Sequence, residues 1–154
     1  MSYPGVRLRV FMYWAGVSVG LISLLACDNN ARAAGKDKVL ATQFGDATFY
    51  AKSLHGNVTA SGIKFDNRKA VAAHRSYPFG TVVRVTNLEN GKAVRVVIVD
   101  RGPYGKNHRE GAIIDLSRAT AAQLGAIRAG QVRVKVEVLA WGDGNLRDQV
   151  RKQP

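Results

Sequence analysis

The 154-residue chain is poor in cysteine and in acidic side chains, and each scarcity narrows what the protein can be. Its single cysteine, Cys27, excludes an intramolecular disulfide and leaves the rest of the sequence without thiol chemistry. Only 11 Asp and Glu residues stand against 23 Lys and Arg, a formal net charge of +12. Such a charge attracts polyanions, so nucleic acid, anionic lipid and acidic wall polymers are the candidate partners.

Common cofactor and metal motifs are also missing from the sequence. No H-x-x-x-H, H-E-x-x-H or paired-cysteine spacing occurs, so no metal site is predicted. The G-x-S-x-G motif, the P-loop and the dinucleotide fingerprint are absent as well, and we expect no cofactor. With 46% hydrophobic residues and no internal repeats, the chain is predicted to form one globular domain and to be a monomer.

The N-terminal 27 residues are typical of an export signal. Two arginines, Arg7 and Arg9, precede an uncharged apolar run over residues 10–26. These 17 residues are fewer than the about 20 that a membrane-spanning helix needs, which favours an export signal over a transmembrane anchor. Export from the cytoplasm removes nucleic acid from the candidate partners, and no known nucleic-acid-binding module is present.

Two cleavage sites compete in this region. The run "LLAC" resembles a bacterial lipobox, in which Cys27 would be lipidated and would anchor the protein to a membrane, for instance the outer membrane. The run "ARA" would instead release a soluble protein after Ala33. Either way, residues 1–27 are expected to be a signal and residues 28–43 a polar tether.

Residues 44–140 are predicted to form a mainly β domain. A short aromatic strand over 44–51 is followed by a Gly-, Ser- and Asn-rich loop over 52–69. Two valine-rich runs around Asn90-Gly91, within residues 81–100, predict a hairpin whose second strand is buried on both faces at "VVIV". We therefore expect a small closed barrel.

The end of the domain shows helical and then strand patterning. Residues 117–125 predict a short helix with Ser117 as its N-cap and Gly125 as its terminator. Residues 132–141 alternate strictly, which places Glu137 on a solvent face. Residues 141–154 are predicted to be a frayed basic tail.

Acidic side chains are few enough for elimination to be informative. Residues 44–139 hold seven, of which Asp46, Glu89, Glu110 and Glu137 are expected to be structural or solvated. Asp100 ends the buried "VVIV" run and Asp115 follows "AII", so they flank one loop that leaves the barrel. Each alone fits a structural acceptor of hydrogen bonds, but together they indicate a site, because burial raises the pKa of a carboxyl toward that of a general acid. His74 is either a buried rim residue or a catalytic one.

Four segments together resemble the rare lipoprotein A family of bacteria: "GDATFYA", "HGNVTASG", "FDNRKAVAAHRSYPFGTVVRVTNLENGKAVRVVIVDRGPY" and "GAIIDLSRATAAQLG". This resemblance implies a six-stranded double-psi β-barrel with one or two short helices, in a periplasmic protein that acts on peptidoglycan. The implied activity is lytic transglycosylation, preferably of glycan strands that lack stem peptides, which leaves 1,6-anhydro ends.

The resemblance also implies site residues. Asp100 and Asp115 would line the groove with Asp66 and His74 beside them as the catalytic set. The expected contacts to substrate are Tyr50, Thr59, Ser61, Arg101 and Tyr104. One position departs from the family pattern, because Ile63 stands where family members carry a glutamate. The alternative is a non-catalytic barrel that binds polysaccharide, as expansins do.

Overall fold

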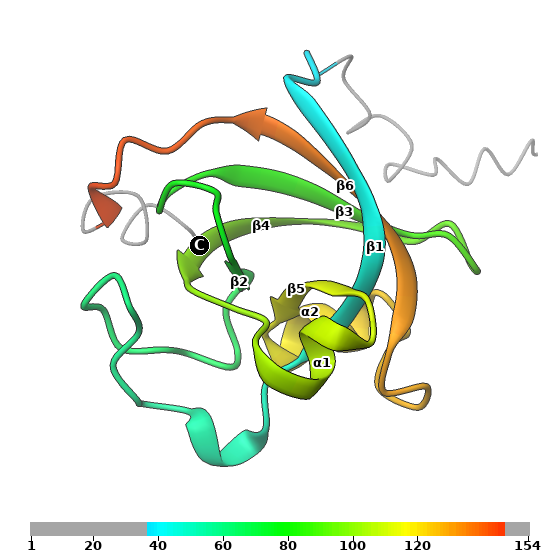
Figure 1. Ribbon diagram of the computed structural model, residues 1–154, viewed down its shortest axis with the longest axis horizontal. Helices are drawn as coiled ribbons and strands as arrows, with labels where there is room; N and C mark the ends of the chain where they lie inside the picture. Colours follow the sequence, from blue (N-terminus) through cyan, green and yellow to red (C-terminus); the bar gives the residue numbers. More distant parts are fainter. Residues whose placement is uncertain (1–36, 147–154) are drawn as a thin grey trace, which may run out of the picture. The chain divides into compact units, whose positions relative to one another are not determined.

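Alternating valine-rich segments build the wall of a closed β-barrel (Figure 1). The computed structural model describes residues 37–146, and the predicted export signal with Cys27 lies outside them. The strands are β1 (Ala41–Phe49), β2 (Val71–His74), β3 (Val82–Asn87), β4 (Ala93–Asp100), β5 (Ala112–Leu116) and β6 (Val132–Ala140). The short helices are η1 (Lys52–Leu54), α1 (Gly105–Arg109) and α2 (Arg118–Gln123).

The strands follow the order β1-β5-β2-β4-β3-β6 around the barrel. Two pairs, β1 with β5 and β2 with β4, are parallel, and the other four are antiparallel. Strand β6 closes the barrel by pairing with both β1 and β3. The predicted fold class is confirmed. No helix within residues 37–146 is long and apolar enough to cross a membrane.

The barrel interior holds the main hydrophobic core. Val83, Val96, Ile98, Ile114 and Leu116 are fully buried there, together with the inward valines of β6. The prediction that "VVIV" is buried on both faces of its strand is confirmed. All four residues, 96–99, are buried, and they belong to two different apolar clusters. Val96 and Ile98 face the interior, whereas Val97 and Val99 face outward.

A second apolar cluster covers this outward face of β4. It consists of Phe65, Val71, Val97, Val99 and Leu146, with Tyr50, Ile63, Phe79 and Val82 packed against it. Phe65 and Ile63 come from the long loop between β1 and β2, which the sequence predicted as a loop. The loop therefore packs on the barrel wall through Ile63 and Phe65, whereas residues 51–58 are exposed.

Both ends of the barrel domain differ from the expected boundaries. β1 begins at Ala41, before residue 44, because its first residues pair with β6. Residues 141–146 pack on the barrel where a frayed tail was expected: Gly144 N donates to Phe79 O at 3.1 Å, and Leu146 is only 3% exposed. Burial of the Leu146 side chain in the outer cluster explains the difference. Residues 147–154 lie outside the described range.

Local signals in the sequence are borne out at the hairpin and at the helix. Gly91 has a φ of 73° in the turn between β3 and β4, a conformation that favours glycine. Ser117 caps α2, and its side chain accepts a hydrogen bond from Thr120 N. Gly125 follows the helix with a φ of 72°, as a C-terminal glycine does.

Glu137 departs from its predicted solvent-facing position. Glu137 is only 8% exposed, and its Oε2 accepts a hydrogen bond from Arg84 Nε at 2.9 Å. Lys135 Nζ lies 3.0 Å from Oε1 of the same carboxylate. Arg84 is the register partner of Glu137 on β3, so the charge is paired across strands, which alternation within one strand cannot reveal.

Candidate active site

Strand β2 brings Asp100 and Asp115 together. It lies between β4 and β5, and its Ala73 is the register partner of Asp100 on one side and of Asp115 on the other. Two inter-strand spacings, about 10 Å, therefore separate the Cα atoms of the acids. Thr48 on β1 is in turn the register partner of Asp115. Residues far apart in sequence thus form one row across four strands.

Asp100 is surrounded by hydrogen-bond donors. Its Oδ2 accepts from the hydroxyl of Tyr50 at 2.7 Å, and its Oδ1 accepts from the backbone N–H groups of Ala60 at 2.7 Å and Arg101 at 2.8 Å. The Arg101 guanidinium points elsewhere: it donates to Tyr77 O at 2.8 Å and lies 3.8 Å from the ring centroid of Phe79. Asp100 is therefore held by neutral donors rather than by an ion pair.

Asp115 has the environment of a proton donor. Burial raises the pKa of its carboxyl, the hydrogen bond from Thr48 Oγ1 opposes this, and the negative charge of Asp100 raises the pKa further. The carboxyl is only half-buried, so it stays within reach of a ligand. A Cβ at Gly102 would lie 3.1 Å from Asp115 Oδ2, so a glycine lets the 101–104 segment pass close to the acid.

Tyr50 forms a wall of the site and donates to Asp100. Burial, the hydrogen bond to Asp100 and the charges of both carboxylates raise the pKa of its phenol far above the usual value. The hydroxyl therefore keeps its proton at any physiological pH. Its ring packs against Phe65, with 4.2 Å between the centroids.

Thr59 and Ser61 lie in a tight loop that faces Asp100. A β-bridge between Val58 and Lys64 closes this loop, and Thr59 Oγ1 donates to Ile63 O at 2.9 Å. The hydroxyl oxygens of Thr59 and Ser61 are 2.8 Å apart. Ile63 packs its half-buried side chain on the outer apolar cluster. An isoleucine thus occupies the place where the family resemblance predicts a further carboxylate.

Asp66 makes a different set of contacts. Its Oδ1 accepts from Arg68 Nε at 3.1 Å and lies 3.6 Å from His55 Nδ1. Hydrogen bonds from Arg68 lower the pKa of Asp66 despite some desolvation. It lines a hollow of about 260 Å³ with His55 and Ile63. No hydrogen bond joins it to Asp100 or Asp115 among the described residues, and an ionised carboxylate cannot serve as a general acid.

His74 is buried at the mouth of the barrel with both ring nitrogens engaged. Nε2 donates to Gln43 Oε1 at 3.0 Å, and Nδ1 accepts from Tyr77 N at 3.1 Å. Its ring stacks on Tyr77, with 3.6 Å between centroids. Burial and the charges of Arg101 and Arg75 lower the pKa of His74 to about 4. With both ring nitrogens bonded, the imidazole orders the loop after β2.

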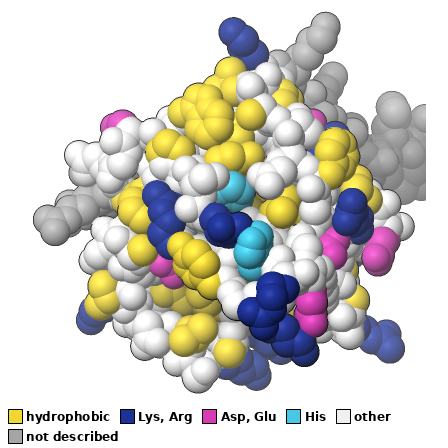
Figure 2. Space-filling model, viewed as in Figure 1, with side chains coloured by type: hydrophobic (Ala, Val, Ile, Leu, Met, Phe, Trp, Pro, Cys, Tyr) yellow, Lys and Arg dark blue, Asp and Glu magenta, His cyan; other side chains and the backbone are white. Residues whose placement is uncertain are grey.

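A hollow of about 410 Å³ opens beside His74. Its lining includes Gln43, Arg75, Ser76, Tyr104 and His108. Figure 2 shows histidine and Lys or Arg side chains gathered near the centre of one face, bordered by hydrophobic side chains. Tyr104, which the sequence predicted as a sugar contact, is 60% exposed at this hollow. Its ring is therefore available to a ligand.

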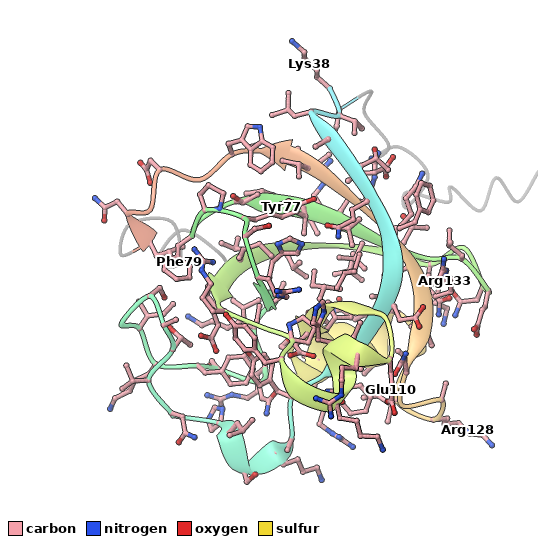
Figure 3. All side chains as sticks on the ribbon, in the orientation of Figure 1. Lys38, Tyr77, Phe79, Glu110, Arg128 and Arg133 are labelled. Atoms are coloured by element: carbon pink, nitrogen blue, oxygen red, sulfur yellow. The ribbon has the colours of Figure 1, made fainter. Side chains whose placement is uncertain are left out.

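Several site residues carry no signal in the sequence. Tyr77 and Phe79 lie in the segment between β2 and β3 (Figure 3) and hold the Arg101 side chain away from Asp100. Thr48 reaches Asp115 only because β1 and β5 pair. Within residues 37–146, no three His, Cys, Asp or Glu side chains come close enough to hold a metal ion.

The fold and this row of acids define a double-psi β-barrel with paired carboxylates. Residues 42–136 match the lytic transglycolase family, and the chain belongs to it. The probable endolytic peptidoglycan transglycosylase RlpA of Aquifex aeolicus is 41% identical, over 87% of this chain and 56% of that protein. The protein of the same name from Treponema pallidum is 51% identical, over 60% of this chain and 28% of that protein. The chain thus matches only part of these relatives.

Solved structures with little sequence identity share the fold. The Streptomyces papain inhibitor superposes with a TM-score of 0.52 at 22% identity, covering 67% of this chain and 98% of the inhibitor. The Clavibacter michiganensis expansin superposes with a TM-score of 0.51 at 24% identity, covering 65% of this chain and 51% of the expansin. At these identities the likeness concerns the barrel alone.

Proposed function

We propose that the protein is a lytic transglycosylase that cleaves peptidoglycan glycan strands, preferably strands without stem peptides, to 1,6-anhydro ends. The observation that carries this proposal is the common register of Asp100 and Asp115 with Ala73. It puts a half-buried acid of raised pKa beside a second carboxylate held by neutral donors. The names of the family and of the curated relatives support the same reaction class.

The reaction needs one proton donor and one stabilising charge. In this mechanism Asp115 gives its proton to the glycosidic oxygen as the bond from that oxygen to C1 breaks. The carboxylate of Asp100 faces the positive charge that develops on the sugar ring. The C6 hydroxyl oxygen of the same sugar then attacks C1, and its proton passes to Asp115. This transfer regenerates the acid and consumes no water.

Polar side chains around the acids are proposed to hold the strand. Tyr50 fixes Asp100, and the hydroxyls of Thr59 and Ser61 lie in the loop that donates to Asp100 from Ala60. Arg101 orders the wall beside the acids, and the exposed ring of Tyr104 offers a sugar contact.

Peptide-free glycan strands test the proposal directly. After incubation, mass spectrometry should detect 1,6-anhydro products with the wild-type protein and almost none with Asp115→Asn or Asp100→Asn. Glu110→Gln is the matched control, because Glu110 is an exposed acid of the same loop whose carboxylate pairs with exposed Lys106. Product formation by Asp115→Asn at the wild-type rate would contradict the assigned role.

A binding barrel without catalysis is the second candidate, and Ile63 favours it. Its aliphatic side chain packs on the outer apolar cluster and cannot transfer a proton. If the wild-type protein pellets with sacculi yet yields no anhydro ends, this candidate replaces the first.

Introducing the missing carboxylate separates the two candidates further. Under the enzymatic proposal, Ile63→Glu should raise the rate of anhydro-product formation, whereas Ile63→Leu should leave it unchanged. Equal rates for both variants would show that position 63 plays no part in the chemistry.

We further propose that the protein is exported and works in the periplasm. The support is the apolar run ahead of Cys27. If Cys27 is lipidated, the wild-type protein should partition into the detergent phase, and the Cys27→Ser variant should not. Cleavage after Ala33 instead predicts an aqueous-phase product for both forms.

A further inference from the structure

Trp141 follows the last strand and presents a large aromatic surface. It lies outside residues 42–136, which match the family, and is 49% exposed. The backbone around it is fixed, because Gly142 N donates to Thr81 Oγ1 at 3.1 Å. A Cβ at Gly142 would lie 2.0 Å from Phe79 O, so only glycine permits this close contact. The indole is thus held in place on the barrel.

Tyr77 connects Trp141 to the hollow beside His74. The rings of Tyr77 and Trp141 are nearly perpendicular, at 86°, with 5.3 Å between centroids. His74 stacks on Tyr77 and lines the hollow, which Tyr104 also lines. The rings of Trp141 and Tyr77 therefore reach the hollow of about 410 Å³ through His74, which lines it.

This aromatic path adjoins the carboxylates. Val82 on β3 pairs with Val97 on β4 and with Ala140 on β6, so the C-terminal ends of β4 and β6 flank the start of β3. Two inter-strand spacings, about 10 Å, separate Val97 from Ala140, and Asp100 lies three residues, about 10 Å, beyond Val97 along β4. Arg101, the neighbour of Asp100, donates directly to Tyr77 O at 2.8 Å. Asp100 and Trp141 therefore lie at the same end of the barrel.

The chemistry of the surface matches a carbohydrate. A hexose has an apolar C–H face that stacks on aromatic rings and a hydroxyl rim that needs hydrogen-bonding groups. The hollow supplies such groups from Gln43, Arg75, Ser76 and His108. The ring of Tyr77 stacks on His74 at its edge, and the ring of Trp141 contacts Tyr77.

We propose that Trp141 and Tyr77 form a sugar-stacking subsite at the barrel mouth that binds the glycan strand next to the carboxylates. The subsite rests on the proposed function, since the same strand must extend to Asp100 and Asp115. It extends the binding surface beyond the family's matched residues by way of the packed 141–146 segment.

Tryptophan fluorescence provides a direct test. The chain has two tryptophans, so Trp14→Phe leaves Trp141 as the only indole. Titration with the β-1,4-linked hexamer of N-acetylglucosamine should shift its emission to shorter wavelength, because stacking excludes water from the ring. An emission spectrum that stays unchanged at saturating hexamer, or up to its solubility limit, would overturn the subsite.

Calorimetric titration with the same hexamer gives the second test. Trp141→Ala should weaken binding about tenfold, whereas Trp141→Phe should retain most of it. Leu88→Ala is the control, because Leu88 is a 46% exposed apolar residue at the opposite end of β3. Unchanged affinity for folded Trp141→Ala would refute the subsite. Absence of anhydro products, with affinity dependent on Trp141, would refute only the proposed catalysis.

Discussion

At the scale of single residues, the two aspartates differ in the groups that contact them. Asp100 receives three neutral donors, whereas Asp115 receives one hydroxyl and lies beneath the backbone at Gly102. Burial favours the neutral form of a carboxyl, and donors favour the charged form. The acid with fewer donors is therefore the one suited to carry a proton.

Replacing Asp115 should change how stability depends on pH. Because the pKa of Asp115 in the folded protein is raised above 3.8, the folded state binds the proton more tightly than the unfolded state. Its contribution to stability is fully present below pH 3.8 and is lost as pH rises through the folded pKa. Asp115→Asn should thus gain stability relative to wild type between acidic and neutral pH, as measured by urea denaturation.

A constant stability difference between wild type and Asp115→Asn across that range would contradict the raised pKa. Glu110→Gln, at an exposed position, is the control for the substitution itself.

His74 should titrate far below the usual range of histidine. Its pKa is lowered from 6.5 to about 4 by burial and by Arg101 and Arg75. The unfolded state therefore binds more protons between these values, and the stability due to neutral His74 is lost as pH falls through about 4. NMR titration of the imidazole should give a midpoint near 4. A midpoint above 6 would show that the ring is solvated.

At the scale of elements, local sequence signals predict where a helix or a hairpin lies, but they do not predict which strands pair with one another. Ser117, Gly125 and Asn90-Gly91 act on their own neighbours, so the helix and the hairpin follow from local sequence. Glu137 looked exposed because alternation describes one strand, while its partner Arg84 lies on another.

In the site, too, the sequence shows which residues are candidates but not which of them meet. That Asp100 and Asp115 end apolar runs is visible in the sequence, but their common partner Ala73 is set by the order of the strands. The contacts of Tyr50, Thr48 and Trp141 depend on that order too. The barrel topology is predicted from the resemblance to a family, because hydrophobic periodicity does not reveal which strands are neighbours.

The packed segment after β6 gives a prediction at this scale. A methyl group at position 142 would lie 2.0 Å from Phe79 O and 2.4 Å from Thr81 N, both backbone atoms that cannot move freely. Gly142→Ala should therefore destabilise the domain by about 1–3 kcal/mol and displace Trp141. Thermal denaturation measures the first effect and Trp141 emission the second. Ala140→Ser, at an exposed neighbour, should change neither.

At the scale of the whole molecule, net charge and short-range contacts should contribute separately to binding of the cell wall. The net charge of +12 acts over the Debye length, whereas the aromatic and carboxylate contacts act only on touching groups. Binding to an anionic wall should therefore contain a long-range part and a short-range part.

Salt separates these parts. Raising NaCl from about 0.1 M to about 1 M shortens the Debye length from about 10 Å to about 3 Å. Retention on sacculi should then fall strongly, while affinity for the uncharged N-acetylglucosamine hexamer should hardly change. If both fall equally, charge rather than stacking governs the sugar contact.

Closure of the barrel depends on its last strand. Because β6 pairs with both β1 and β3, a chain that stops before Val132 leaves each of those strands with a row of unpaired backbone groups. Such edges recruit strands from other molecules and promote aggregation. Truncated or incompletely synthesised copies should therefore aggregate rather than persist as partly active monomers. Residues 132–140 are thus the segment on which folding of the whole domain depends.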